Sequence, residues 1–268
     1  MLNLGKQNIL GVGVDAVDYD YSIDRIIAAA FDKRSFTISA LAVHGVMTGA
    51  LDPVQRYRLN DLDLVVPDGQ PVRWAMNWLY GIKLPDRVYG PTLTLKVCER
   101  AAKEGLGVYL YGSQPPVLRS FEANLKKKFP NLIISGSQPS RFRQISPGEQ
   151  REISKTICDS GAAIVLVGLG CPRQETWVFE NRELLPMPLL AVGAAFDFHA
   201  GNVSQAPAWL QERGLEWFYR LLQEPGRLWK RYAYTNPLYL LLLFLQLIRL
   251  HTRALEDNVS PQGQIRFG

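Results

Sequence analysis

The sequence is poor in cysteine and histidine. Its 268 residues include only three of each, and no two cysteines form a Cys-x-x-Cys pair. This scarcity argues against a disulfide framework and a cysteine-based zinc site, and it fits a reducing compartment. His44, His199 and His251 are too scattered to predict a metal site. His44 or His199 could act as a base, but a lone histidine is more often a hydrogen-bonded structural residue. We expect no metal and no cofactor.

Other signatures are missing too. The chain contains neither G-x-S-x-G nor H-E-x-x-H, so serine-hydrolase and zincin chemistry lack support. The first residues lack a charged stretch followed by an apolar stretch and a cleavage site, so we expect no signal peptide and a cytosolic location. The net charge of +5 is too small to indicate nucleic-acid binding, but it is compatible with phosphates or a membrane surface.

The composition is that of a globular protein. Hydrophobic residues make up 47% and charged residues 21% of the chain, which excludes a disordered chain, a collagen-like chain and a coiled coil. Seven short apolar runs are predicted strands: Ile9–Val14, Phe36–Ser39, Leu62–Val66, Val108–Tyr111, Leu132–Ser135, Ala163–Val167 and Leu189–Val192. Most are apolar at consecutive positions, as strands buried on both faces are.

Helical patterns lie between these runs. Ser22–Lys33 begins with a capping serine, Asp52-Pro53 reads as a cap followed by proline, and Pro116–Phe129 ends in three lysines. Pro147–Asp159 is the fourth helix that we predict. Strands that alternate with helices indicate βαβ units and a mostly parallel sheet flanked by helices, which is an α/β fold.

The last sixty residues differ from the rest. From Ala206 onward the pattern predicts only helix, first basic and then apolar over Tyr232–Ile248. That run has 17 residues, interrupted by Asn236 and Pro237, and so falls short of the roughly 20 that span a bilayer. Two interpretations stay open: a helix buried in the fold or a subunit interface, or a segment at a membrane surface beside basic and aromatic residues.

Glycines follow the first predicted strand. Gly11–Asp15 reads Gly-Val-Gly-Val-Asp, which could bring backbone amides close to a phosphate. The third glycine of a dinucleotide fingerprint would fall at Ala16, so the match fails and a tight turn is the better explanation. Asp15 is equally compatible with a turn and a ligand role.

Two Asp-x-Asp triplets resemble a metal clamp. Asp18–Asp20 and Asp61–Asp63 carry the right ligands for Mg²⁺ or Mn²⁺. The pattern is short, however, and Asp61 and Asp63 precede a strand, at the wrong edge of a parallel sheet for a site. We therefore interpret both triplets as structural.

Three strand ends carry small and polar residues together. Asp68 follows one buried strand, Gly168, Gly170 and Arg173 follow another, and a third ends in Val192–Phe198, which contains Gly193 and Asp197. Open α/β sheets bind ligands at this edge, and a helix N-terminus with an arginine suits an anion. We expect a cleft there. Asp68 alone reads equally as a helix cap or a general base.

Seven segments together resemble the WecG/TagA/CpsF family of bacterial glycosyltransferases. They occur in the family's order and cover almost the whole chain. They are GVGVD (Gly11–Asp15), VPDG (Val66–Gly69), LPDRVYG (Leu84–Gly90), VGLGCPRQE (Val167–Glu175), VGAAFDFHAG (Val192–Gly201), QAPAWLQERGLEW (Gln205–Trp217) and YRLLQEPGRLWKRY (Tyr219–Tyr232). Several of these patterns are long and unusual, which makes the resemblance specific.

The resemblance implies a Rossmann-like core, residues 1–204, and a helical C-terminal appendage, residues 205–268. It implies a cytoplasmic enzyme, peripheral at the inner face of the cell membrane, that works without a metal. Such enzymes transfer an N-acetylmannosamine-type sugar, with inversion, from a UDP-sugar donor to a lipid-linked saccharide on undecaprenyl diphosphate, for surface polysaccharide biosynthesis. Ser39 and Gln205 depart from the family's pattern, which leaves open which N-acetylhexosamine is used.

Residue roles follow from the same resemblance. It implies Asp68 as the catalytic base, with Thr37 also catalytic, and Gln174 as a substrate-binding residue. The family's cations for the donor diphosphate fall on Arg220 and Arg227, with Lys230 or Arg231 as the third.

Two alternative hypotheses assign the protein to other functional classes. A nucleotide-binding oxidoreductase fits the sheet pattern, although the glycine fingerprint is imperfect and no acidic ribose-binding residue is evident. A membrane-attached scaffold without catalysis would explain the C-terminal run. The appendage could also pack on a second subunit, so a homo-oligomer is a further expectation.

Overall fold

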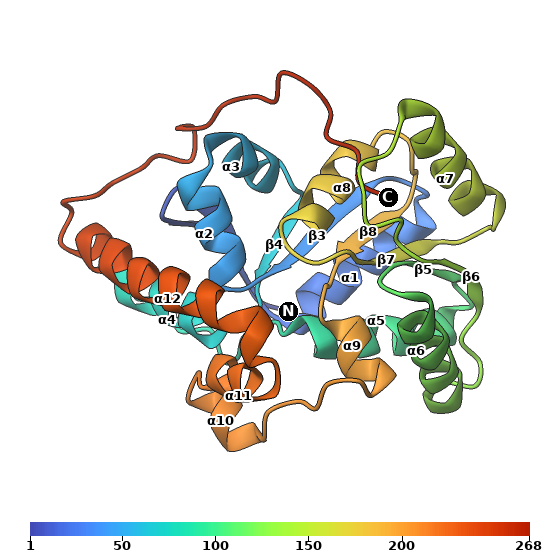
Figure 1. Ribbon diagram of the computed structural model, residues 1–268, viewed down its shortest axis with the longest axis horizontal. Helices are drawn as coiled ribbons and strands as arrows, with labels where there is room; N and C mark the ends of the chain where they lie inside the picture. The colour runs from blue at the N-terminus through green and yellow to red at the C-terminus, as the bar shows by residue number, and fades with distance from the viewer.

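A six-stranded sheet forms the centre of the protein. The computed structural model describes residues 1–268, and the strands follow the order β4-β3-β8-β7-β5-β6 (Figure 1). Every neighbouring pair is parallel. The strands are β3 (Phe36–Leu41), β4 (Leu64–Pro67), β5 (Val108–Gly112), β6 (Ile134–Gln138), β7 (Ile164–Gly168) and β8 (Pro188–Ala191). The predicted Rossmann-like α/β fold is confirmed.

The first predicted strand is wrong. Instead of one strand over Ile9–Val14, the chain forms an antiparallel hairpin of β1 (Asn3–Ile9) and β2 (Val12–Val17), outside the parallel sheet. Leu10 and Gly11 form the turn with φ of 57° and 87°. Two-residue hairpin turns of this kind need positive φ at both central residues, so the glycine is used for a turn, as predicted.

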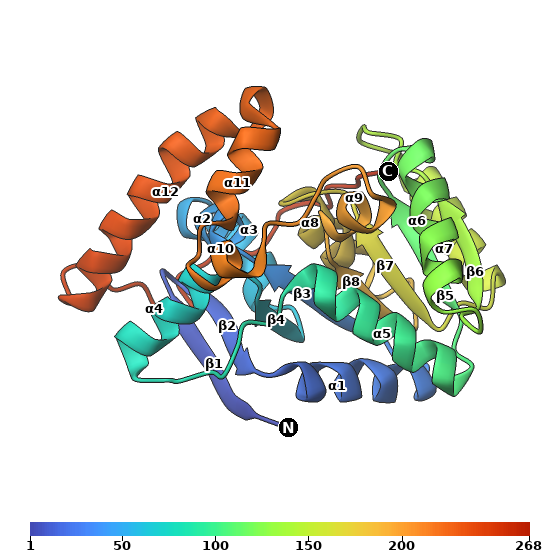
Figure 2. The ribbon, with the colours of Figure 1, turned by 90° about the horizontal axis from the view of Figure 1, so that it is seen from below.

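Helices cover both faces of the sheet. They are α1 (Tyr19–Phe31), α2 (Val43–Leu51), α3 (Pro53–Asn60), α4 (Gln70–Tyr80), α5 (Gly90–Glu104), α6 (Pro115–Lys128), α7 (Pro147–Asp159), α8 (Arg173–Asn181) and α9 (Ala195–Ala200). Helices α1, α5, α6 and α9 share one apolar cluster, and α2, α3, α4, α7 and α8 share the other (Figure 2). Alternate residues of β5, such as Tyr109 and Leu110, enter opposite clusters. These strands are therefore buried on both faces, which explains their apolar runs.

Helix caps account for several boundaries. Helix α1 begins earlier than predicted, because the carboxylate of Asp18 accepts the Tyr21 N–H at 2.8 Å. Asp52 caps α3 ahead of Pro53, as predicted, and Ser146 caps α7 in a capping box. Asp18 thus has a structural use, since a capping carboxylate satisfies amides that have no partner within the helix.

The C-terminal region holds three more helices and an extended tail. The helices are α10 (Ala208–Glu212), α11 (Glu216–Gln223) and α12 (Pro225–Leu247), and α12 continues through Pro237. Residues 251–268 contain no helix, so the prediction of helix to the end of the chain is wrong there. This tail runs back across the core (Figure 1), where Val259 N–H donates to Pro53 O and Ile145 N–H to Arg266 O.

Candidate active site

A cavity of about 810 Å³ lies at the carboxyl edge of the sheet, between the core and the C-terminal helices. Its lining includes the residues that follow four strands: 42–45 after β3, 68–71 after β4, 169–171 after β7 and 192–194 after β8. Helices α11 and α12 supply the opposite wall. Three of these four strand ends are those at which the sequence predicted a cleft.

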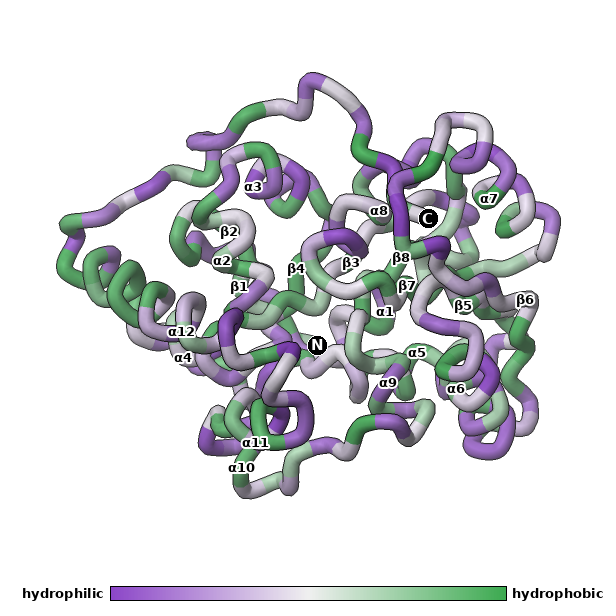
Figure 3. The backbone as a smooth tube through the Cα atoms, in the orientation of Figure 1, coloured by the Kyte–Doolittle hydropathy of each residue, from purple (hydrophilic) through white to green (hydrophobic).

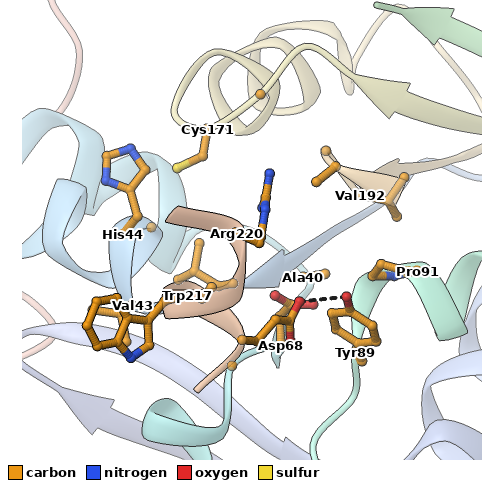
Figure 4. A pocket seen from close by; sticks show the side chains of 18 of the residues that line it. Ala40, Val43, His44, Asp68, Tyr89, Pro91, Cys171, Val192, Trp217 and Arg220 are labelled. Carbon is orange, nitrogen blue, oxygen red and sulfur yellow. Dashed lines mark hydrogen bonds between the residues drawn. The ribbon is translucent and has the colours of Figure 1, made fainter. Parts of the chain in front are cut away.

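Asp68 lies at the base of this cavity, directly after β4 (Figure 4). Its Oδ1 accepts the N–H of Gly90, the first residue of α5, at 2.5 Å. Burial raises the pKa of Asp68 to about 6, while the nearby Arg87 and the Gly90 hydrogen bond act to lower it. The side chain does not cap its own helix α4, and its helix contact is instead with the first amide of α5. A carboxylate with a pKa near neutrality suits a general base.

Three residues that the sequence did not single out surround Asp68. Arg87 forms an ion pair with Glu216 at 2.9 Å, and Tyr89 O–H donates to the same carboxylate at 2.6 Å. Arg87 also donates to the backbone carbonyl of Asp68 at 3.2 Å. Glu216 is the first residue of α11, so these contacts fasten α11 beside Asp68. Their only sequence signal is that they lie within two of the segments that carry the resemblance.

Three arginines of the C-terminal helices line the cavity: Arg220, Arg227 and Arg231. Arg220 and Arg227 share one oxygen of Glu224, at 3.5 and 2.5 Å. The Nε atoms of Arg220 and Arg231 are buried without a hydrogen-bond partner. Lys230 does not line the cavity, and its ammonium lies against the Trp229 ring instead. Of the two candidates for the third diphosphate cation, Arg231 therefore lines the cavity and Lys230 does not.

Asp197 of α9 completes this charged wall. Burial raises its pKa, Arg227 and Arg220 lower it, and Glu224 raises it. The side chain of Asp197 thus lies among the same charges as Arg220 and Arg227.

Gln174 organises the turn after β7. It is buried, its Oε1 accepts the Gly170 N–H at 3.2 Å, and its Nε2 donates to Glu175 Oε1 at 2.8 Å. A Cβ on Gly193, which has φ of 53°, would lie 3.0 Å from Gln174 Oε1. A Cβ on Gly168 would lie 2.7 Å from the Phe196 ring. These glycines therefore permit close packing at the site. Arg173 lines the cavity next to them.

Two predicted site residues do not reach the cavity. Thr37 lies near the start of β3, at the amino edge of the sheet, and its hydroxyl donates to Asp63 at 2.7 Å. At the cavity, β3 instead presents Ala40 and Leu41. Asp15 accepts the Val65 N–H at 2.7 Å and so ties the hairpin to β4. Both side chains thus connect neighbouring strands and lie outside the cavity lining.

The Asp-x-Asp triplets also lie outside the cavity lining. Asp61 forms an ion pair with Arg182, Asp63 bonds Thr37, and Asp18 caps α1. These contacts support the structural interpretation of both triplets.

The family model of the glycosyl transferase WecG/TagA/CpsF family matches residues 7–253. The chain belongs to this family. The matched range includes the whole sheet, the cavity and helices α10–α12, and it ends within the extended tail. The protein is thus a glycosyltransferase of cell-surface polysaccharide synthesis.

The geometry suits group transfer by this glycosyltransferase. Figure 4 shows Asp68 and Tyr89 on one side, His44 and Cys171 on the other, and Arg220 between them. A half-buried carboxylate faces a cationic wall across one cavity, and that wall belongs to helices that Glu216 ties to the core. Such an arrangement can hold an anionic leaving group at one end and a hydroxyl nucleophile at the other.

Proposed function

We propose that the protein transfers an N-acetylhexosamine-type sugar, with inversion and without a metal, from a UDP-sugar to a lipid-linked saccharide at the inner face of the cell membrane. The observation that carries this proposal is that Asp68 and the three arginines of α11 and α12 line a single cavity. Family membership supplies the reaction class, and the cavity supplies a base and a site for a diphosphate.

Asp68 acts first in this proposal. Its carboxylate removes the proton of the acceptor hydroxyl, and that oxygen attacks the anomeric carbon from the face opposite UDP. The bond from the anomeric carbon to the phosphate oxygen breaks, and its electron pair stays on the diphosphate. One displacement inverts the anomeric carbon. The raised pKa of Asp68 makes it a stronger base than an exposed aspartate.

The arginines act on the leaving group. The diphosphate gains negative charge as the bond breaks, and cations already in place lower the barrier. Arg220 and Arg231 each have a buried Nε without a partner, so both have a donor to offer. Arg227 contributes a third charge at the same wall. This is the work that a divalent cation performs in other transferases.

Docked helices keep water out of this site. Helix α11 contacts the core through Glu216, and Gly214 packs so closely on Trp74 that a Cβ would lie 2.6 Å from its ring. Closure of the cavity matters because water that reached the anomeric carbon would hydrolyse the donor.

A membrane surface is the proposed location of the acceptor. No helix of the structure combines the length and hydropathy needed to cross a bilayer. Helix α12 is nevertheless hydrophobic over much of its length (Figure 3), and the side chains of Leu240, Leu241, Phe244 and Leu247 are exposed. Its first turns carry basic residues, which anionic lipid headgroups attract.

The first test is UDP release from a panel of UDP-sugars, with a lipid-diphosphate N-acetylglucosamine acceptor and EDTA present. Acceptor-dependent release is expected, and it would identify the donor sugar. Absence of release from every donor, together with no UDP binding in calorimetry, would contradict the proposal. A change in nicotinamide absorbance would instead favour an oxidoreductase, and a scaffold would give neither signal.

A further inference from the structure

His44 is a cavity residue that the mechanism above does not use. It lies in the first turn of α2, and its side chain is part of the cavity lining, on the side of Cys171 (Figure 4). Arg220 lies between His44 and Asp68 in this view. His44 therefore lies at the cationic end of the cavity, away from the proposed base.

The charged side chain near His44 disfavours the protonated form of its imidazole. Arg231 of α12 faces the ring and disfavours its protonated form, while the backbone of Cys171, in the turn after β7, favours that form. The Cys171 thiol is neutral, because burial holds its pKa far above the ordinary value. No acidic side chain offsets Arg231 at the ring. Burial and Arg231 together lower the pKa of His44 to about 4, so the imidazole is neutral at pH 7.

A bound diphosphate would instead favour the protonated form of His44. Its negative charges would lie among Arg220, Arg227 and Arg231, and would offset the repulsion that Arg231 exerts on the ring. The first-turn amides of α2, which have no partner within the helix, favour an anion at the same place. One ligand can thus accept hydrogen bonds from α2, through its first-turn amides and His44, and from α12, through Arg231.

We infer that His44 is a further diphosphate-binding residue, which takes up a proton from solvent when the nucleoside diphosphate binds and adds its positive charge to those of Arg220, Arg227 and Arg231. This inference rests on the proposed function, because it requires a diphosphate in the cavity. The proton stays on the ring while the bond to the anomeric carbon breaks. It returns to solvent when the diphosphate leaves.

Histidine NMR tests the inference on the unaltered protein. The chain has only three histidines, so His199→Gln and His251→Gln assign two imidazole signals and leave the third to His44. We expect that the His44 signal titrates near pH 4 in the free protein. With saturating UDP, its apparent pKa rises by about three units, so that the ring carries a proton near pH 7, and the other two signals do not respond to UDP.

Kinetics give a second readout. His44→Gln retains a donor but cannot become a cation, so we expect its KM for the donor to rise about tenfold or more. This rise in KM should be smaller at pH values above the pKa of His44 in the diphosphate complex, where the native imidazole is also neutral. His251→Gln, on the extended tail, is the matched control and should leave KM unchanged.

The outcomes separate this inference from the proposed function. UDP binding in calorimetry without a shift of the His44 signal overturns the inference and leaves the function intact. Inorganic pyrophosphate that shifts the signal, with no binding of UDP, upholds His44 as a diphosphate residue and overturns the nucleotide donor. If neither UDP nor pyrophosphate binds, both proposals fall.

Discussion

At the scale of single residues, the environment of Asp68 decides what its carboxylate can do. Burial opposes its ionisation, whereas Arg87 and the Gly90 amide favour it, and burial has the larger effect. The result is a carboxylate that is ionised at neutral pH yet has a greater affinity for a proton than an exposed aspartate. These opposing influences lead to two predictions, one on activity and one on stability.

We predict that activity falls on acidification with an apparent pKa near 6. Asp68 must be ionised to accept a proton, so kcat/KM should drop about tenfold per pH unit below that value. Asp68→Asn should lower kcat by about a hundredfold to ten-thousandfold and spare UDP binding. Initial rates from pH 4.5 to 9 and calorimetry of UDP binding measure both. A near-normal kcat for Asp68→Asn would remove Asp68 from the role of base.

The same carboxyl should destabilise the fold at neutral pH. A carboxyl whose pKa is raised on folding contributes stability below pH 3.8 and loses that contribution as the pH rises through about 6. Asp68→Asn should therefore unfold at a higher temperature than the native protein at pH 8, and the difference should vanish at pH 4. Thermal unfolding at both pH values tests this. An equal Tm at pH 8 would mean that the carboxylate is well solvated.

Sequence reasoning reached some site residues and missed others for a physical reason. Asp68 and Gln174 follow strands, and the carboxyl ends of parallel strands share one edge, so their positions could be predicted. Thr37 precedes the middle of its strand, and the resemblance alone placed it at the site. Glu216 could not be found, because its pairing with Tyr89 spans 127 residues and depends on how α11 docks.

At the scale of elements, helices α11 and α12 carry charges that a substrate must displace. Glu224 lies at the junction of the two helices and pairs with both Arg220 and Arg227. A diphosphate that binds these arginines competes with this carboxylate. Glu224 therefore holds the arginines in place in the free protein at some cost in donor affinity.

We predict that Glu224→Gln lowers the KM for the donor about two- to fivefold. The expected gain is small, because both ion pairs are partly exposed and such pairs contribute about 0.2–1 kcal/mol. Donor KM at low salt measures it, and added salt should reduce the difference. Glu212→Gln, on the neighbouring helix α10, is the control. A higher KM would mean that Glu224 mainly orients the arginines.

We predict that helix α11 becomes more mobile when the contacts of Glu216 with the core are removed. Glu216→Gln removes the ion pair with Arg87, whose side chain is buried, and leaves that guanidinium without its carboxylate. Amide hydrogen exchange should then speed up at residues 208–223 more than in the central strands. Turnover should fall and donor hydrolysis by water should rise. Unchanged exchange in α10 and α11 would show that other contacts hold these helices.

The two segments that the sequence did not predict, β1 and the extended tail, both lack a local sequence pattern. Strand β1 is largely polar and exposed, and its Leu-Gly turn lacks the Asn-Gly signal of a hairpin. The tail over residues 251–268 has no periodic pattern, since it is held by scattered hydrogen bonds to distant segments, as between Asn60 and Leu255. Local patterns predict structure where burial is periodic, as in α1, or continuous, as in β7, and they fail where a segment is held by contacts to distant residues.

At the scale of the whole molecule, α12 faces two environments. Tyr239 and Leu243 are buried against the core, and Arg231 lines the cavity, whereas Leu240 and Phe244 are exposed. The extended tail that follows fastens the far end of this helix to the hairpin and α3. The exposed apolar face therefore has a fixed orientation relative to the cavity. Leu240 is exposed and also lines the cavity, so this face borders the cavity that contains Asp68.

We predict that Phe244→Glu weakens binding to anionic vesicles by about tenfold or more, because it replaces a large apolar side chain with a charge at the proposed lipid contact. Phe31→Glu on α1 is the matched control, since Phe31 is 55% and Phe244 56% exposed. Co-sedimentation with vesicles of phosphatidylglycerol and phosphatidylcholine measures the difference. Equal loss in both variants would point to general apolar binding. Loss of a dimer from Phe244→Glu alone, without loss of vesicle binding, would assign this face to a second subunit.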